Sequence, residues 1–138
     1  MPEPTPLKIK GFDPYADLIG FEFTKFEKGY SQCVLKVNEN HFNPHQIVHG
    51  GVMYSMADTG MGAALVSLLE KDELCATVEI KISYFKPVRE GELICNTKVI
   101  HKGKTVGFLE SEIMNGEIVI SRANGTFSIF KIKKPREY

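Results

Sequence analysis

The sequence lacks an excess of charge of either sign, because 17 lysine and arginine residues balance 17 aspartate and glutamate residues. A balanced chain exerts no general electrostatic attraction on nucleic acid or on an anionic membrane surface. We therefore expect neither as a partner. The same neutrality makes association between copies of the chain easy to tolerate.

Cysteine is scarce, and Cys33, Cys75 and Cys95 form no Cys-x-x-Cys pair. An odd number of widely spaced cysteines predicts reduced thiols rather than a disulfide framework. Residues 1–10 are polar and contain three prolines, unlike a signal peptide or a transit peptide. We predict a cytoplasmic protein with one domain over residues 1–138, in which residues 1–10 form a flexible tail.

The sequence also lacks a membrane span, the motif of a serine hydrolase and a convincing set of metal ligands. No stretch suits a membrane span, because the best candidate, residues 52–69, contains a charge, hydroxyl side chains and two glycines. No Gly-x-Ser-x-Gly elbow of a serine hydrolase is present. His41, His45 and His49 have the spacing of metal ligands on a helix, but Pro44 argues against a helix there. We therefore predict no metal site.

Strand patterns make up most of the chain. β-rich runs predict strands over residues 18–28, 30–37, 74–87, 92–101, 105–114 and 117–131. Alternation within the third run places four apolar side chains on one buried face: Val78, Ile80, Ile82 and Tyr84.

One segment, residues 50–69, predicts a long helix because it is rich in alanine, methionine and leucine. Small residues within it, Gly60 and Gly62, would allow close helix packing. A nearly uncharged helix needs cover on most of its sides. We expect an α+β domain whose antiparallel sheet of about six strands wraps around this central helix.

Asp58 is the only charged residue between residues 52 and 69. One helical turn away in either direction lie four side chains, none of them a cation: Tyr54, Ser55, Met61 and Gly62. An isolated buried carboxylate is costly, so it either meets water or a donor on a neighbouring strand, or it serves in catalysis. Asp58 is therefore the candidate catalytic carboxylate.

Gly50 and Gly51 open the predicted helix. Glycine lets the backbone approach a ligand closely, and the first N–H groups of a helix lie unpaired at its positive end. Such groups can stabilise an oxyanion, although a glycine-rich helix entry also has a purely structural explanation. Gly50 lies about 12 Å from Asp58 along one helix, too far for both to act on one carbonyl. Two antiparallel helices related by a two-fold axis near Tyr54 would close this gap, so we expect a homodimer with two equivalent sites.

Several motifs together carry a family resemblance: Asn43, His49-Gly50-Gly51, Ala57-Asp58-Thr59, Thr77-Val78-Glu79-Ile80, Ser83-Tyr84-Phe85-Lys86-Pro87-Val88, Gly91 and His101-Lys102-Gly103-Lys104. With them, the chain from about Leu18 to Phe130 resembles the hotdog-fold acyl-coenzyme A thioesterases, in the branch that includes phenylacetyl-coenzyme A thioesterases. The resemblance implies an enzyme that hydrolyses an acyl-coenzyme A to acid and coenzyme A. It also implies a hotdog fold and a homodimer, or a homotetramer built as a dimer of dimers.

The resemblance further assigns catalytic roles. The Gly50 N–H and the Asn43 side chain would hold the thioester oxygen, and Asp58 of the other subunit would act as general base or nucleophile. Thr77 would position the attacking water. His49 would support the loop that carries Asn43. The sequence departs from the family at Gln46, where glycine is usual.

Substrate-binding candidates fall into two groups. Basic side chains suit the coenzyme A phosphates, and the candidates are Lys86, Arg89, Lys102 and Lys104. An apolar acyl tunnel would be lined by methionines, with Met53, Met56, Met61 and Gly51 as its candidates. A thioester already has a good leaving group, so we expect no cofactor beyond the coenzyme A of the substrate.

Two other functions fit the same fold. A hotdog hydratase acting on an enoyl thioester commonly pairs aspartate with histidine, and the predicted helix contains no histidine. A regulatory domain that binds acyl-coenzyme A without hydrolysing it would have no use for Asp58, Asn43 and Thr77 together. Both features favour the thioesterase.

Overall fold

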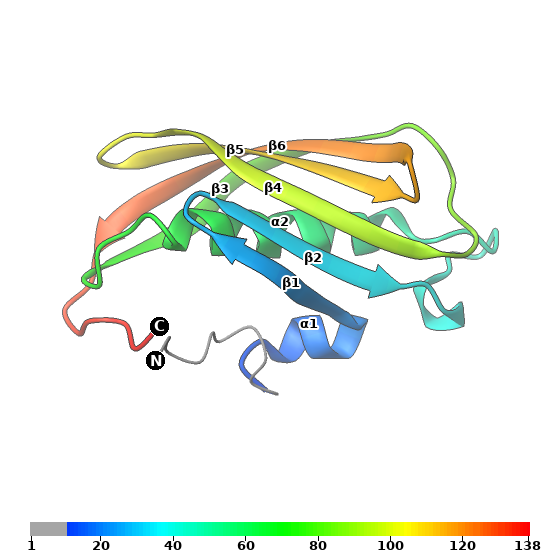
Figure 1. Ribbon diagram of the computed structural model, residues 1–138, viewed down its shortest axis with the longest axis horizontal. Coiled ribbons are helices and arrows are strands. Elements are labelled where there is room, and N and C mark those ends of the chain that lie inside the picture. Colours follow the sequence, from blue (N-terminus) through cyan, green and yellow to red (C-terminus); the bar gives the residue numbers. More distant parts are fainter. Residues whose placement is uncertain (1–10) are drawn as a thin grey trace.

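The computed structural model describes residues 11–138, in which a six-stranded antiparallel sheet wraps around one long helix (Figure 1). The elements in chain order are α1 (Pro14–Ile19), β1 (Phe21–Glu27), β2 (Tyr30–Lys36), the 3-10 helix η2 (Glu39–His41), α2 (Gly50–Val66), β3 (Glu73–Tyr84), β4 (Glu92–Lys102), β5 (Val106–Asn115) and β6 (Ile118–Lys131). The predicted α+β hotdog architecture is confirmed. The predicted tail, residues 1–10, lies outside the described residues.

The strands are ordered β1-β2-β4-β5-β6-β3, so β1 and β3 form the two edges. All neighbouring strands pair antiparallel. Although β3 follows α2 directly in the chain, it pairs with β6 at the far side of the sheet. The sheet curves so that α2 lies in its concave face (Figure 1).

Helix α2 ends at Val66, three residues earlier than predicted. The Ser67 hydroxyl donates to the Ala64 carbonyl oxygen at 2.6 Å and accepts from the Gly29 N–H at 2.7 Å. The next two N–H groups reach back only three residues, from Leu68 to Leu65 and from Leu69 to Val66. These contacts tighten the last turn and satisfy carbonyl groups at the helix end.

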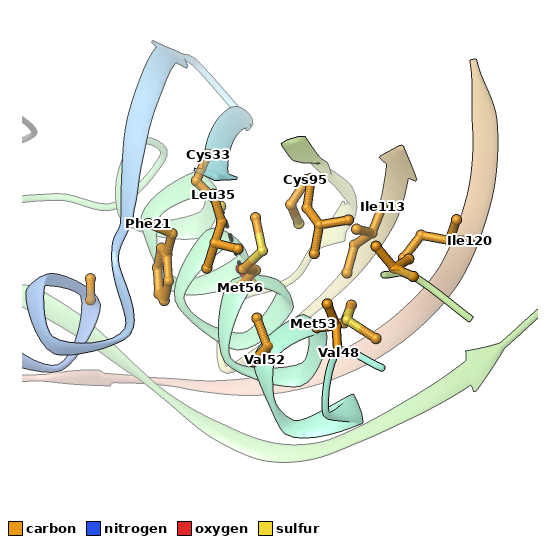
Figure 2. Close-up of a cluster of buried hydrophobic side chains, with 13 residues drawn as sticks. Phe21, Cys33, Leu35, Val48, Val52, Met53, Met56, Cys95, Ile113 and Ile120 are labelled. Atoms are coloured by element: carbon orange, nitrogen blue, oxygen red, sulfur yellow. Dashed lines mark hydrogen bonds between the residues drawn. The ribbon is translucent and has the colours of Figure 1, made fainter. Parts of the chain in front are cut away.

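The core fills the space between α2 and the sheet (Figure 2). Met56 of α2 is fully buried with Leu35 of β2 and Ile113 of β5. Burying one such side chain contributes about 1.5–3 kcal/mol to folding. Gly60 allows the predicted close packing, since a Cβ there would lie 2.8 Å from Oγ1 of Thr97.

Strand β3 corrects one prediction. Ile80 and Ile82 are half-buried as expected, but Val78 is 63% exposed and Tyr84 is 48% exposed. The pairing with β6 shifts register between Thr77 and Glu79, which is a β-bulge. The inserted residue interrupts the alternation at Val78, which is therefore exposed. Tyr84 keeps the same face as Ile80 and Ile82 and contacts Gly50 of α2, although part of its ring is exposed.

Candidate active site

Gly50 is the first residue of α2, and its N–H meets no acceptor within residues 11–138. The ring of Tyr84 packs against it, so a Cβ at position 50 would lie only 2.9 Å from Cζ of that ring. The Tyr84 hydroxyl donates to the Gly50 carbonyl oxygen at 2.8 Å. Burial, followed by the neighbouring Tyr54, raises the pKa of Tyr84, so its hydroxyl stays protonated as a donor.

His49 caps the helix, because its Nδ1 accepts the Gly51 N–H at 2.7 Å. The Gly51 N–H is therefore occupied, whereas the Gly50 N–H remains a free donor within the described residues. The side chain of His49 contacts the helix start, whereas the resemblance assigned it to the loop that carries Asn43. The main chain of His49 reaches back, donating to the His41 carbonyl oxygen at 2.8 Å.

The loop before the helix is held by Asn43 itself. Its side-chain oxygen accepts the N–H of His45 at 2.8 Å and that of Ile47 at 3.4 Å. Its main-chain N–H donates to the Ile47 carbonyl oxygen at 2.8 Å. These contacts fix the amide group by its oxygen. Its NH₂ group meets no acceptor in the described part of the chain and can donate to a ligand.

Gln46 has φ 63°, the only left-handed backbone of a non-glycine residue in the described part of the chain. Such a conformation costs most side chains about 1–2 kcal/mol and suits glycine. The loop therefore keeps the backbone that glycine would favour, although the sequence places glutamine there. Its main-chain N–H donates to the Asn43 carbonyl oxygen at 3.0 Å, which closes the turn.

A pocket of about 330 Å³ opens beside the helix start. Asn43 and Gly50 line it, together with Met53, Tyr84 and Lys86. Two potential hydrogen-bond donors, the Asn43 NH₂ and the Gly50 N–H, thus border the same space. This arrangement suits a carbonyl oxygen that becomes negatively charged during reaction.

Asp58 lies half-buried in the middle of α2, and the Thr77 hydroxyl donates to its Oδ1 at 2.7 Å. The ion pairs among residues 11–138 use other carboxylates: Glu110 with Lys98, Glu112 with Arg122 and Asp72 with Lys131. Asp58 is therefore free of a cation within this part of the chain. Such a carboxylate retains an oxygen that can take a proton from water.

The bulge at Val78 brings two β3 side chains to the same helix. Before the bulge, Thr77 faces α2 and contacts Asp58; after it, Tyr84 faces α2 and contacts Gly50. Seven residues separate Thr77 from Tyr84, and on a regular strand an odd separation would place them on opposite faces. One inserted residue therefore lets a single strand contact both Gly50 and Asp58.

Gly50 and Asp58 belong to one uninterrupted helix. Eight residues correspond to about 12 Å along its axis. Two groups that act on the same carbonyl must each lie within about 3 Å of it. One chain therefore cannot bring both groups to the same carbonyl. We refer to the two positions as the candidate oxyanion half-site at Gly50 and the candidate carboxylate half-site at Asp58.

The basic candidates divide between the two ends of the molecule. Lys86 lines the pocket at the helix start, and Arg89 follows in the loop between β3 and β4. Lys102 ends β4, and Lys104 lies in the turn to β5, at the end of the sheet near the close of α2 (Figure 1). Within one chain, the two pairs cannot contact the same phosphate group.

The methionine candidates also differ in position. Met53 borders the pocket beside Gly50. Met56 and Met61 are fully buried in the core, and Met61 packs against Gly125 of β6. In this conformation neither is accessible to a ligand. A different face of α2 borders an apolar cavity. Its lining residues are Thr59, Gly62, Ala63 and Val66.

Two residues near the site, Tyr84 and Cys75, were not predicted from the sequence to belong to it. Tyr84 was predicted as an apolar strand position, although it contacts Gly50. Cys75 lies on β3 close enough to Asp58 to feel its charge. The pKa of Cys75 is raised to about 11, mainly by burial; Arg136 acts to lower it, and Asp58 adds to the increase.

Within the described residues, no group of three or more histidine, cysteine, aspartate or glutamate side chains is arranged to hold a metal ion. None of the helices in residues 11–138 combines the length and hydropathy needed to cross a membrane.

Comparisons with known proteins show the family of the chain. The family model described as the thioesterase superfamily matches residues 45–121. A protein of Saccharolobus solfataricus, provisionally named an esterase, is 34% identical over 83% of this chain and 77% of its own length. The acyl-coenzyme A thioesterase PaaI of Escherichia coli is 29% identical over 75% of this chain and 72% of its own. A solved structure of E. coli PaaI, from the phenylacetic acid degradation operon, superposes with a TM-score of 0.80 at 25% identity, covering 89% of this chain and 87% of that one.

Proposed function

The chain belongs to the thioesterase superfamily, and from this premise we propose that its substrate is an acyl-coenzyme A, hydrolysed at a site shared by two subunits. The observation that carries the proposal is Asp58, held by Thr77 and free of a cation in residues 11–138. A purely structural carboxylate would have no need to remain without a cation in a half-buried position.

The proposed reaction uses both half-sites. Asp58 takes a proton from water, whose oxygen attacks the thioester carbonyl carbon. Charge develops on the carbonyl oxygen, where the Gly50 N–H and the Asn43 NH₂ of the second subunit donate hydrogen bonds. Collapse of the tetrahedral intermediate breaks the carbon–sulfur bond. The coenzyme A thiolate leaves and takes the proton from Asp58, which restores the carboxylate, and the acyl group departs as the carboxylic acid.

The dimer follows from the separation of the half-sites. When two α2 helices pack antiparallel about a two-fold axis near Tyr54, each Gly50 comes beside the Asp58 of the other copy. Tyr54 is 37% exposed, so it is available for such a contact. The same pairing brings the Lys86 end of one chain toward the Lys102 end of the other, where both can contact coenzyme A phosphates.

Release of free thiol from acetyl-, octanoyl- and phenylacetyl-coenzyme A tests the proposal. We expect Asp58→Asn to lower kcat about 100- to 10,000-fold, the usual contribution of a general base. Asp72→Asn is the matched control, because it removes an exposed carboxylate paired with Lys131. Normal turnover by Asp58→Asn would exclude this mechanism. Tight binding of the esters by the unmodified chain without thiol release would instead support the regulatory domain.

A further inference from the structure

His41 is a buried histidine between α1 and the loop that leads into α2, and it is only 5% exposed. Both nitrogens of its ring are in use. Nδ1 accepts the Asn38 N–H at 3.0 Å, so Nε2 carries the ring proton and donates it to the Ile19 carbonyl oxygen at 2.6 Å. A neutral imidazole with both nitrogens paired has no atom left to bind a metal ion or to exchange a proton with a substrate.

A short antiparallel ladder joins the chain after His41 to the chain before α2. The His49 N–H donates to the His41 carbonyl oxygen at 2.8 Å. The Asn43 N–H donates to the Ile47 carbonyl oxygen at 2.8 Å, and the residue pair between these two bonds forms an antiparallel bridge. The side chain of Asn43 projects from this ladder, and the Gly50 N–H follows it directly in the chain. Both candidate oxyanion donors therefore depend on where the ladder lies.

The ladder is anchored to the rest of the fold on two sides. On one side, the Val48 N–H donates to the Val88 carbonyl oxygen at 2.8 Å, in the loop between β3 and β4. On the other side, the anchor is the imidazole of His41, through the Ile19 carbonyl oxygen at the end of α1. A Cβ at Gly20 would lie 3.9 Å from Nε2, so the turn from α1 into β1 also contacts the ring. In agreement with these contacts, α1 ends and α2 begins at the same end of the molecule (Figure 1).

We propose that His41 is a positioning residue of the candidate oxyanion half-site. The inference rests on the proposed function, since the half-site has a role only if a thioester is hydrolysed. The imidazole does not touch the substrate; it holds the ladder so that the Asn43 NH₂ and the Gly50 N–H point at the same oxygen. Such donors must lie about 2.7–3.1 Å from the oxygen as it becomes charged. A shift of the ladder by about 1 Å therefore slows the reaction about 100-fold.

A histidine that only stabilises the fold would behave differently when replaced. Its loss would lower the free energy of unfolding but leave the kcat of the folded molecules unchanged. Loss of a positioning residue also lowers kcat, because the oxyanion forms only as the reaction proceeds and KM is set before that step. Its effect is also smaller when a donor that it positions is already absent.

The first measurement is thiol release by His41→Ala and His41→Asn, at a temperature where urea denaturation shows each variant to be folded. The substrate is whichever of acetyl-, octanoyl- and phenylacetyl-coenzyme A the unmodified chain hydrolyses fastest. Alanine removes both ring contacts, whereas asparagine keeps an acceptor for the Asn38 N–H and removes the bond to Ile19. We expect kcat to fall about 10- to 100-fold in both variants, with KM nearly unchanged.

Ser67→Ala is the matched control at the far end of α2. Like the ring of His41, the Ser67 hydroxyl joins two main-chain groups, accepting the Gly29 N–H and donating to the Ala64 carbonyl oxygen. Its loss should lower the free energy of unfolding and leave kcat unchanged. This comparison separates a lost link within the fold from a displaced oxyanion donor.

The second measurement is a double-mutant cycle. In the Asn43→Ala background, where one oxyanion donor is already lost, His41→Ala should lower kcat by a factor at least about three times smaller than in the unmodified chain. In the Thr77→Val background, which alters the candidate carboxylate half-site, His41→Ala should keep its full effect. If His41→Ala does not fold, His41→Asn takes its place in both measurements.

The outcomes separate this inference from the proposed function. Hydrolysis with an unchanged kcat in the folded His41 variants would overturn the inference and leave the thioesterase standing. So would a fall in kcat by the same factor in the Asn43→Ala and Thr77→Val backgrounds. Absence of hydrolysis of every ester by the unmodified chain would overturn the proposed function, and the inference with it.

Discussion

The Thr77 hydroxyl donates a hydrogen bond of 2.7 Å to Oδ1 of Asp58, joining edge strand β3 to the middle of α2. One carboxylate oxygen is thereby fixed, and the other has no hydrogen-bond partner among residues 11–138. The bulge at Val78 makes this contact possible while Tyr84, farther along β3, still faces the helix start. The two candidate half-sites, at Gly50 and at Asp58, thus both lie between α2 and β3.

Thr77→Val removes the hydroxyl and preserves the shape of the side chain. A hydrogen bond to a charged group contributes about 1.5–3 kcal/mol, so we expect kcat to fall about 10- to 150-fold. KM should change little, because the contact positions the carboxylate rather than the substrate. Thiol-release kinetics measure both constants. Thr77→Ser is the matched control and should retain most of the activity; equal kcat values for Thr77→Val and the unmodified chain would remove Thr77 from the mechanism.

Mixing two inactive variants tests whether the site is shared between subunits. Asn43→Ala disables the oxyanion half-site and Asp58→Asn disables the carboxylate half-site. A heterodimer of the two has one site with both defects and one intact site. After denaturation and refolding of an equal mixture, random pairing makes about half of the dimers mixed, so about one quarter of the unmodified activity should return. Activity no greater than the mean of the two separate variants would place both groups in one subunit.

Much of this arrangement was predictable from the sequence. Asp58 is the only charge in an apolar segment, and a helix fixes its distance from Gly50. The candidate carboxylate, and the expectation of a second copy if both groups share one substrate, therefore follow from helical geometry. The bulge at Val78 was not predictable, because simple alternation continues through it and nothing in the residue types marks an insertion. For the same reason, the contact of Tyr84 with Gly50 could not be predicted. Burial of Met61 was missed because composition does not reveal which face of a helix meets the sheet.

Gln46→Gly should stabilise the fold. The left-handed backbone costs glutamine about 1–2 kcal/mol, which glycine would not pay. The greater freedom of glycine in the unfolded chain destabilises the fold by about 0.5–1 kcal/mol and offsets part of this gain. We expect a net rise of about 0.5–1 kcal/mol in the free energy of unfolding, measured by urea denaturation. Gln46→Ala is the control, since alanine keeps a Cβ at φ 63° and should bring no such gain. A lower free energy of unfolding in Gln46→Gly would show that the glutamine side chain contributes a contact that outweighs the strain.

Cys75 offers a reporter of the charge on Asp58. With its pKa raised from 9.0 to about 11, about one thiol in a thousand is ionised at pH 8, against about one in ten for an ordinary cysteine. Alkylation of Cys75 by iodoacetamide, followed by mass spectrometry of its peptide, should therefore be slow at pH 8 and rise about tenfold per pH unit up to pH 10. A rate that levels off below pH 9 would contradict the raised pKa.

The alkylation rate of Cys75 should respond in opposite directions to the loss of its two charged neighbours. Because Asp58 raises the pKa of Cys75 and Arg136 lowers it, Asp58→Asn should speed alkylation at pH 8 and Arg136→Gln should slow it. Cys33 and Cys95 are fully buried and should react only after unfolding, which gives an internal check that each variant remains folded. An unchanged rate at Cys75 in Asp58→Asn would contradict the contribution of Asp58 to the raised pKa of Cys75.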